Sequence, residues 1–344
     1  MPMCAVPLAV VHCGEASRRV TRLFAAALLL CHLAGQDEAP RHAGAHVLRS
    51  GSLLVEVMDP TAPERYNTGV RFTPLAAVLR ASFAGHEYFF NPLEHDRSDD
   101  HAGLASEFDL CNPGCPAGDL LPGYAEAGVG GGFLKIGVGV LEKSAKPYDL
   151  RSHPRLLQAA STAVQWFGDA ADFSQSCPGV AGFAYELHAH VALGQGRIDI
   201  VWSLRNSGSR QFTTTHYTHN FFRFDSHDVG PDYALTFPYP ISVSGAAPEQ
   251  VVDPQGIRFI APIPHHVNLL VPYPPDYMSA NTCRLSHLGG MSIAVSTSVP
   301  GIRTAIHARP AYCSPEQFVS IALPPGGEET WTRSWVFSLV PSSR

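Results

Sequence analysis

Hydrophobic and polar residues alternate most clearly from Arg197 to Leu204, where every second residue is apolar. An alternation with a period of two predicts a half-buried β-strand. Tyr185 to Val191 shows the same pattern, and the Gly-rich turn from Gly194 to Gly196 favours a hairpin between the two runs. A third run follows from Phe212 to Phe224. We therefore expect an antiparallel meander of three strands, with His219 in the third.

Shorter apolar runs bounded by turn-forming residues predict further strands. They lie at Leu53 to Met58, Val78 to Phe83, Phe133 to Leu141, Met291 to Thr297, Gln317 to Leu323 and Thr330 to Leu339. The apolar spacing of Leu156 to Phe167 fits either a strand or one helix. No internal repeat or low-complexity linker separates the runs, so we expect an all-β protein with one domain from residue 38 to residue 344.

Composition narrows the class of protein. The chain has 344 residues, of which 45% are hydrophobic and 16% charged, and its formal net charge is -6. Such a chain can bury a core, which excludes an intrinsically disordered protein. No block of Lys and Arg stands out, so the charge pattern of a nucleic-acid-binding protein is missing. The 30 Gly and 29 Pro are scattered between short apolar runs, as expected for strands joined by turns.

The N-terminal segment has the pattern of an export signal. Arg18, Arg19 and Arg22 precede a run of eleven mostly apolar residues, Leu23 to Leu33, and small residues follow it. This pattern is typical of a cleaved signal peptide, and the run is too short to span a bilayer. We expect residues 1 to 35 to be removed and the mature protein, without a membrane span, to be periplasmic or extracellular. The alternative is a membrane-proximal or mis-started N-terminal extension.

Removal of that segment leaves five cysteines, an odd number, so at least one is free or paired elsewhere. Cys111 and Cys115 enclose Asn112 to Gly114 and could form a small loop disulfide in an oxidising compartment. A zinc site at this pair lacks two further ligands at a suitable spacing, so no metal site is predicted.

Two short motifs contain candidate catalytic residues. His219 lies among aromatic residues in Tyr217 to Phe222, and Glu316 follows a proline in Ser314 to Phe318. An imidazole and a carboxylate can move protons in opposite directions when both reach one substrate. The two residues are 97 positions apart, so only the fold can bring them together. The residue types alone also fit a core or rim histidine and a solvated glutamate at the start of a strand.

Several motifs resemble, in their order and spacing, those of the galactose mutarotase-like superfamily, and within it a divergent exported branch of aldose 1-epimerase-like proteins. They are Tyr66 to Phe72 followed by Gly85 to Phe89, Lys135 to Leu141, Leu204 to Gly208, Tyr217 to Phe222, and Pro315 to Phe318 with Pro325, Gly326 and Trp331. The resemblance implies a β-supersandwich of two large twisted antiparallel sheets with a concave face that holds a hexose. It also favours a strand for Leu156 to Phe167.

The resemblance assigns roles to individual residues. His219 resembles the catalytic histidine of the family, and Glu316 resembles its catalytic glutamate. Two stretches that grip the sugar in better-known members, Gly-Arg-x-x-Asn-Arg and Leu-His-Gly-Gly, are missing from this chain. The candidates for contacts to the substrate are Arg71, His86, Lys135, Asn220 and Asp276.

These residues imply interconversion of α and β anomers. Glu316 as general base would take the proton of the C1 hydroxyl while protonated His219 gives a proton to O5, which opens the ring. This reaction requires no cofactor and no metal. The expected partner is a carbohydrate, either a hexose or the reducing end of an oligosaccharide. The alternative is a non-catalytic carbohydrate-binding supersandwich whose tryptophans stack on sugars, although these side chains also suit core packing.

Overall fold

The computed structural model describes residues 39–108, 121–149, 153–245, 249–273, 276 and 281–340. The predicted export segment and the pair Cys111 and Cys115 lie outside these residues. From Pro40 onward, the described residues belong to one compact unit. Within the described ranges, no helix is long and apolar enough to cross a membrane.

The described residues fold into antiparallel sheets and contain no α-helix, which confirms the all-β prediction. One sheet has nine strands: β1 (Ala45–Ser50), β2 (Leu53–Met58), β3 (Val78–Phe83), β5 (Leu104–Phe108), β13 (Phe212–Asn220), β21 (Tyr312–Leu323), β20 (Arg303–Arg309) and β17 (Val267–Pro272) in spatial order, with β4 (His86–Glu87) paired to β3.

A second sheet has ten strands. Their order is β15 (Gln250–Asp253), β16 (Gly256–Phe259), β14 (Tyr233–Thr236), β18 (Thr282–His287), β19 (Met291–Thr297), β22 (Glu328–Leu339), β12 (Arg197–Asn206), β11 (Phe183–Gly194), β10 (Ala170–Val180) and β9 (Ser161–Trp166). A small third sheet consists of β6 (Gly132–Lys135), β7 (Gly139–Glu142) and β8 (Leu156–Ala159).

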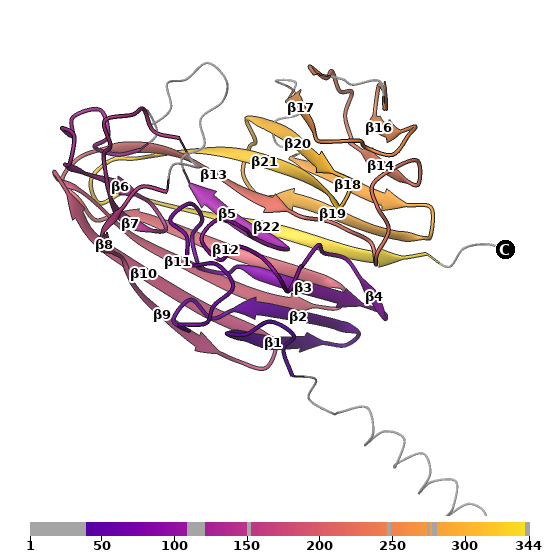
Figure 1. Cartoon of the computed structure of the whole chain (residues 1–344), viewed down its shortest axis with the longest axis horizontal. Coiled ribbons are helices and arrows are strands. Elements are labelled where there is room, and N and C mark those ends of the chain that lie inside the picture. Colours follow the sequence, from indigo (N-terminus) through magenta and orange to yellow (C-terminus); the bar gives the residue numbers. More distant parts are fainter. Residues whose placement is uncertain are drawn as a thin grey trace, which may run out of the picture. The chain divides into compact units, whose positions relative to one another are not determined.

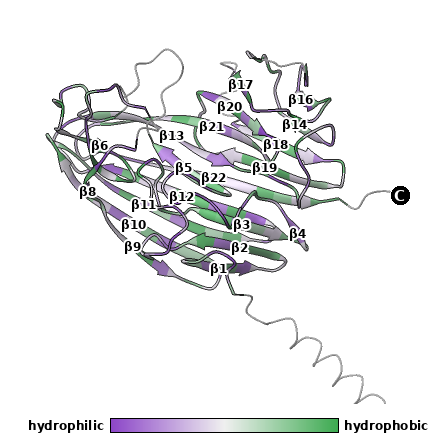
Figure 2. Cartoon of the chain, viewed as in Figure 1, coloured by the Kyte–Doolittle hydropathy of each residue, from purple (hydrophilic) through white to green (hydrophobic). Residues whose placement is uncertain are grey.

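The two large sheets pack face to face, and the core lies between them. In Figure 1, strands β2, β3 and β5 lie in front of β10, β11 and β12. Trp202 of β12 and Trp331 of β22 stack with ring centroids 6.4 Å apart, and Phe108 of β5 meets Trp202 edge-on at 6.2 Å. Figure 2 shows hydrophobic residues along β2, β3 and β12, where the sheets overlap. Aromatic side chains of this size contribute most of the buried apolar surface of such a core.

The predicted three-stranded meander is wrong. β11 and β12 do form the expected hairpin, which turns at Gly196 with a φ of 64°. The other edge of β12 pairs with β22, however, and β13 pairs with β5 and β21 in the opposite sheet. Alternation shows which face of a strand is buried and carries no information on which strand lies beside it.

Other predicted strands keep, extend or divide their expected ranges. β2, β3 and β19 have the predicted bounds, and β21 and β22 begin earlier than predicted, at Tyr312 and Glu328. Phe133 to Leu141 divides into β6 and β7, because Gly137, with a φ of 83°, turns the chain. Leu156 to Phe167 is extended, as the resemblance implied, and divides into β8 and β9.

Candidate active site

Strand β13 presents alternate residues to opposite sides of the nine-stranded sheet. His216 and Asn220 face the ten-stranded sheet, because each accepts a hydrogen bond from a tryptophan of β22: Trp331 to His216 Nδ1 at 3.0 Å, and Trp335 to Asn220 Oδ1 at 2.8 Å. Successive side chains of a strand point to opposite faces. His219 therefore lies on the face turned away from the ten-stranded sheet.

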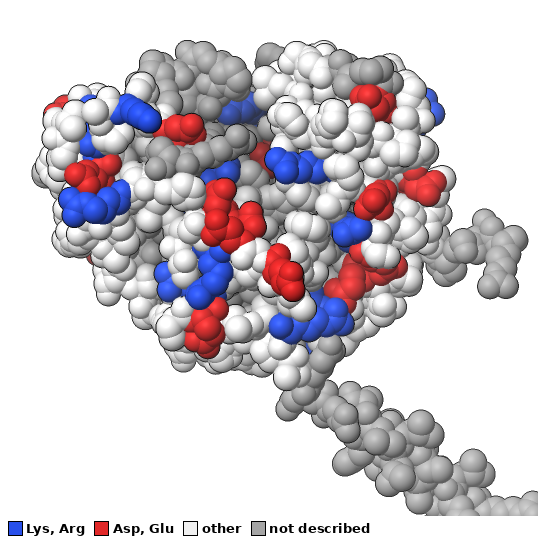
Figure 3. Space-filling model, in the orientation of Figure 1, with Lys and Arg blue, Asp and Glu red and all other residues white. Residues whose placement is uncertain are grey.

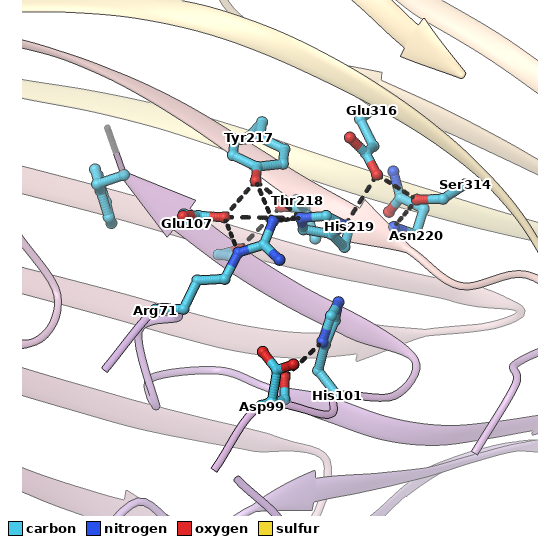
Figure 4. Close-up of polar contacts among 12 residues, drawn as sticks. Arg71, Asp99, His101, Glu107, Tyr217, Thr218, His219, Asn220, Ser314 and Glu316 are labelled. Atoms are coloured by element: carbon cyan, nitrogen blue, oxygen red, sulfur yellow. Dashed lines mark hydrogen bonds and ion pairs between the residues drawn. The ribbon is translucent and has the colours of Figure 1, made fainter. Parts of the chain in front are cut away.

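The fold brings His219 and Glu316 together on that face, since β13 and β21 are neighbouring strands. His219 Nδ1 lies 2.9 Å from Glu316 Oε1, although the N–H is not aligned well enough for a good hydrogen bond. The Ser314 hydroxyl donates to the same Glu316 oxygen at 2.9 Å and accepts from the backbone N–H of Asn220 at 2.8 Å. The carboxylate is thus held in place against the imidazole (Figure 4).

Two further polar side chains contact the other ring nitrogen of His219, Nε2. His219 Nε2 lies 2.8 Å from the Tyr217 hydroxyl and 3.3 Å from a guanidinium nitrogen of Arg71. Both partners also contact Glu107 of β5: the Tyr217 hydroxyl donates to it, and Arg71 Nε donates to it at 2.9 Å. Figure 4 shows Arg71 reaching Glu107, Tyr217 and His219 together.

Glu107 is a fully buried carboxylate with two cationic partners. Besides Arg71, the ammonium group of Lys135 donates to Glu107 Oε1 at 3.2 Å. Burial would raise the pKa of Glu107, but the charges of Arg71 and Lys135 hold it well below its usual range. Glu107 is therefore ionised and supplies a permanent negative charge beneath the imidazole.

His219 favours the imidazolium form. Burial would lower the pKa of His219, but Glu316 and Glu107 raise it above its usual value. In that form Nδ1–H faces Glu316, Nε2–H donates to the Tyr217 hydroxyl, and that hydroxyl donates to Glu107. The protons on Nε2 and on the Tyr217 hydroxyl each have an acceptor, and Nδ1 lies 2.9 Å from Glu316 Oε1. The arrangement therefore holds an acid and a base in contact, ready to exchange protons with a bound group.

A second imidazole, that of His101, lies beside the pair of His219 and Glu316. Its ring is edge-on to His219 with centroids 5.0 Å apart, and it packs against Phe72 at 4.1 Å. Burial and the charge of His219 hold the pKa of His101 well below its usual range. His101 Nδ1 is 3.4 Å from the carbonyl oxygen of Asp99, whereas the buried Nε2 has no hydrogen-bond partner among the described residues.

His101 and Glu107 are absent from the sequence-based candidates, because neither lies in a motif or in one of the predicted strands; Glu107 belongs to β5 and His101 to the segment just before it. Strand β5 is only five residues long and is buried throughout. Its alternation, with Ala105 and Glu107 on one face, is a weak signal that could have revealed it.

The structure places the predicted substrate contacts at different distances from the pair. Arg71 contacts His219 of the pair directly, as described above. Lys135 is buried behind Glu107, where its ammonium group also donates to the carbonyl oxygen of Phe108 at 3.2 Å. His86 lies elsewhere, with Nδ1 3.0 Å from Asp225 Oδ2. Asn220 is turned to the core, as its contact with Trp335 shows, and Asp276 is exposed.

A cavity of about 290 Å³ adjoins this group on the His101 side. Its walls include residues of the segment from Arg65 to Pro74 and of strands β2, β3, β5 and β10. His219 and Glu316 are not in its lining, because the rings of Phe72 and His101 stand between the cavity and the imidazole of His219. Its volume is at the lower end of the range of small-molecule sites, roughly 300–1,000 Å³.

Several solved structures are similar to this fold. A Synechocystis sp. PCC 6803 protein aligns with a TM-score of 0.56 and 13% sequence identity, over 89% of this chain and 99% of its own. A candidate aldose 1-epimerase from Escherichia coli K12 aligns with a TM-score of 0.56 and 14% identity, over 86% of this chain and 99% of its own. The fold is that of the galactose mutarotase-like proteins.

A GalM/aldose epimerase homologue from C. elegans shares the galactose mutarotase-like fold, with a TM-score of 0.53 and 11% identity, over 86% of this chain and 99% of its own. No protein-family model matches the sequence, and no curated protein is similar to it. Identities this low establish a shared architecture, so the chemistry has to be argued from the side chains of this chain.

Proposed function

We propose that the chain is an aldose 1-epimerase-like enzyme that interconverts the α and β anomers of a hexose or of the reducing end of an oligosaccharide. The observation that supports this most directly is the 2.9 Å contact between His219 Nδ1 and Glu316 Oε1 on the face away from the ten-stranded sheet. Both residues are nearly closed to solvent, at 7% and 4% exposure. A base and a charged acid held side by side are what ring opening requires.

The reaction follows from this proton arrangement. Glu316 takes the proton of the C1 hydroxyl, the C1–O5 bond breaks as C1 gains its carbonyl, and His219 gives its proton to O5. Rotation about C1–C2 presents the other face of the carbonyl, and reversal of both transfers closes the ring. Arg71 and Glu107 act as positioning residues, because they hold Tyr217 and His219 Nε2 in place and leave Nδ1 turned to the base.

The test is NMR exchange between anomers across a panel of sugars. We expect His219→Asn and Glu316→Gln each to slow exchange by about 10²- to 10⁴-fold, since each removes one proton-transfer group. His265→Asn and Glu329→Gln, at exposed positions, are the matched controls and should keep the wild-type rate. Wild-type protein that fails to accelerate exchange of any sugar would contradict the enzymatic proposal.

One observation favours a second candidate, a non-catalytic carbohydrate-binding protein. His219 and Glu316 touch each other directly, so their contact has to open before a sugar oxygen can lie between them. A protein that binds sugars without turnover would not need that opening. Binding of a sugar by calorimetry together with an unaccelerated anomer exchange would favour this candidate.

Export is part of the proposal, with a domain from residue 38 to residue 344 remaining after cleavage. It rests on the basic residues and the short apolar run of the N-terminal segment. Sequencing the N-terminus of the mature protein, after separation of exported and internal fractions, tests it. An intact N-terminus in the internal fraction would overturn it.

A further inference from the structure

Strand β20 carries a buried arginine, Arg303, next to the acid–base pair of His219 and Glu316. Arg303 pairs with Phe318 across β20 and β21, and its guanidinium carbon lies 4.1 Å from the centre of the Phe318 ring. Tyr217, which contacts His219, stacks on the same Phe318 with ring centroids 4.3 Å apart. Because Phe318 is two residues from Glu316 on one strand, both side chains point to the same face. Arg303 therefore lies on the face of the sheet that holds the pair.

Arg303 differs from the other buried arginines in its partners. Among the described residues, Arg80, Arg303 and Arg333 are buried, at 3%, 7% and 0% exposure. Arg80 donates to two glutamates, and Arg333 donates to two backbone carbonyl oxygens. Figure 3 shows that most basic side chains on the viewed face also lie beside acidic ones. Arg303 stacks on Phe318 and forms no hydrogen bond or ion pair with any residue that the structure describes.

The position of Arg303 is costly unless a bound molecule uses its donors. A guanidinium that is removed from water without an acceptor destabilises the folded protein, and a cation–π contact offsets only part of that cost. Burial lowers the pKa of Arg303, while the charges of Tyr217 and Glu316 act against this shift. The group stays charged, as arginine does in proteins. None of its nitrogen atoms is fully enclosed, so its N–H groups are open to a bound molecule.

The carboxylate of the proposed general base also has an oxygen open to a bound molecule. Glu316 Oε1 accepts from the Ser314 hydroxyl and faces His219 Nδ1. Glu316 Oε2 has no such partner within the described ranges, and it is not fully enclosed either. The residue opposite Glu316 on β20 is Ala305, whose side chain is only a methyl group. Oε2 is therefore the oxygen available to take the proton of the C1 hydroxyl.

The strand register places Arg303 diagonally across from Glu316. Ala305 pairs with Glu316 and Arg303 with Phe318, and diagonal neighbours on one face are about 7–8 Å apart, within reach of long side chains. An oxygen bound at Glu316 Oε2 is therefore also within reach of the Arg303 guanidinium. When Glu316 takes the proton of the C1 hydroxyl, negative charge passes from the carboxylate to O1 until the carbonyl of C1 has formed. A positively charged donor aimed at O1 stabilises that charge as it develops.

We infer that Arg303 is a further catalytic residue, whose N–H donates to O1 of the sugar as the ring opens. The inference rests on the proposed function, since it adds one group to the same reaction. Glu316 takes the proton of O1, His219 gives a proton to O5, and Arg303 stabilises the charge that O1 carries between these events. No proton leaves Arg303, so the proton balance of ring opening is unchanged.

The experiment measures kcat and KM for anomer exchange by NMR, together with the urea midpoint of unfolding. We expect Arg303→Met to lower kcat by about 10²- to 10³-fold with KM unchanged, because the donor acts on a charge that develops only in the transition state. Its urea midpoint should equal or exceed that of the wild type, because methionine removes a buried charge without a counter-ion. Arg303→Lys, which keeps the charge without the planar fork, should recover part of kcat. Arg205→Met, at an exposed position of β12, is the control and should leave all three quantities unchanged.

The outcomes separate the two proposals. A loss of kcat in Arg303→Met with undiminished stability supports the inference. A wild-type kcat per folded molecule in Arg303→Met, whether KM rises or not, overturns the inference and leaves the enzymatic function intact. If the wild type itself exchanges no sugar, the function fails and the inference falls with it, and this failure is visible before any variant is measured.

Discussion

His216 and His219 are two buried histidines on one strand, three positions apart, with opposite surroundings. On the core side, His216 Nδ1 accepts from Trp331 Nε1 at 3.0 Å and from Arg333 Nε at 3.1 Å. Burial and the charge of Arg333 hold the pKa of His216 well below its usual range. On the other side, Glu316 and Glu107 outweigh burial and raise the pKa of His219. One histidine is a neutral acceptor, and the other is a charged donor.

The difference shows that burial does not decide what a histidine does. Both rings are removed from water, which favours the neutral form of each, so the neighbouring charges account for the difference between their protonation states. Burial favours the neutral ring of His216 and the cation beside it adds to that effect, and the neutral ring satisfies two donors of the core. Carboxylates next to His219 select the imidazolium, which is the form that proton donation to a ring oxygen needs.

The largest effect is expected when the charge beneath His219 is removed. Glu107→Gln leaves Arg71 and Lys135 buried without their carboxylate, which should lower the free energy of unfolding by about 3–5 kcal/mol. Urea denaturation measures the loss. Glu329→Gln, on the exposed part of β22, is the matched control and should unfold at the wild-type urea concentration. Equal midpoints for the two variants would show that the network does not stabilise the fold.

A smaller loss of stability, without loss of chemistry, is expected on the core side. His216→Leu removes the acceptor of Trp331 Nε1 and Arg333 Nε and should lower the free energy of unfolding by about 1–3 kcal/mol. The rate of anomer exchange per folded molecule should stay at the wild-type value, because His216 faces away from the site. His216→Gln, which keeps an acceptor oxygen, should lose less stability. An exchange rate that falls with His216→Leu in fully folded protein would contradict the division between the two faces.

Alternation and short apolar runs were sufficient to predict strands such as β2, β12 and β19, but they predicted none at β5, β10 or β17. The motifs around His219 and Glu316 were sufficient, through the family resemblance, to select that pair. The same alternation also bears on Asn220: as the neighbour of His219 on a strand, it has to face the other way. Glu107 and His101 could not be predicted, because their place in the site depends on β5 pairing with β13, a contact between segments more than 100 residues apart. Long-range pairing of this kind leaves no periodic trace in either segment.

The pairing of the ten-stranded sheet was unpredictable for a related physical reason. Trp202 and Trp331 lie opposite each other across β12 and β22, although each belongs to an apolar run that would suit several neighbours. Strand order follows from how these large side chains fill the space between two sheets. The apolar runs therefore favoured core packing for these tryptophans without indicating which strands they join.

The smallest expected effect, and the sharpest comparison, is the pH dependence of stability. An unfolded histidine has a pKa of about 6.5. Because the folded pKa of His219 is raised, its contribution to stability is complete below about pH 6.5 and is lost as the pH rises through the folded value. The folded pKa of His216 is lowered, so its contribution is complete above about pH 6.5 and is lost as the pH falls towards the folded value.

The measurement is the difference in unfolding free energy between wild type and His219→Asn, and between wild type and His216→Asn, from pH 5 to pH 9. The first difference should shrink on the alkaline side and the second on the acidic side. Two profiles of the same slope would mean that both faces of β13 impose the same electrostatic environment, and the assignment of His219 as the acid would lose its physical basis.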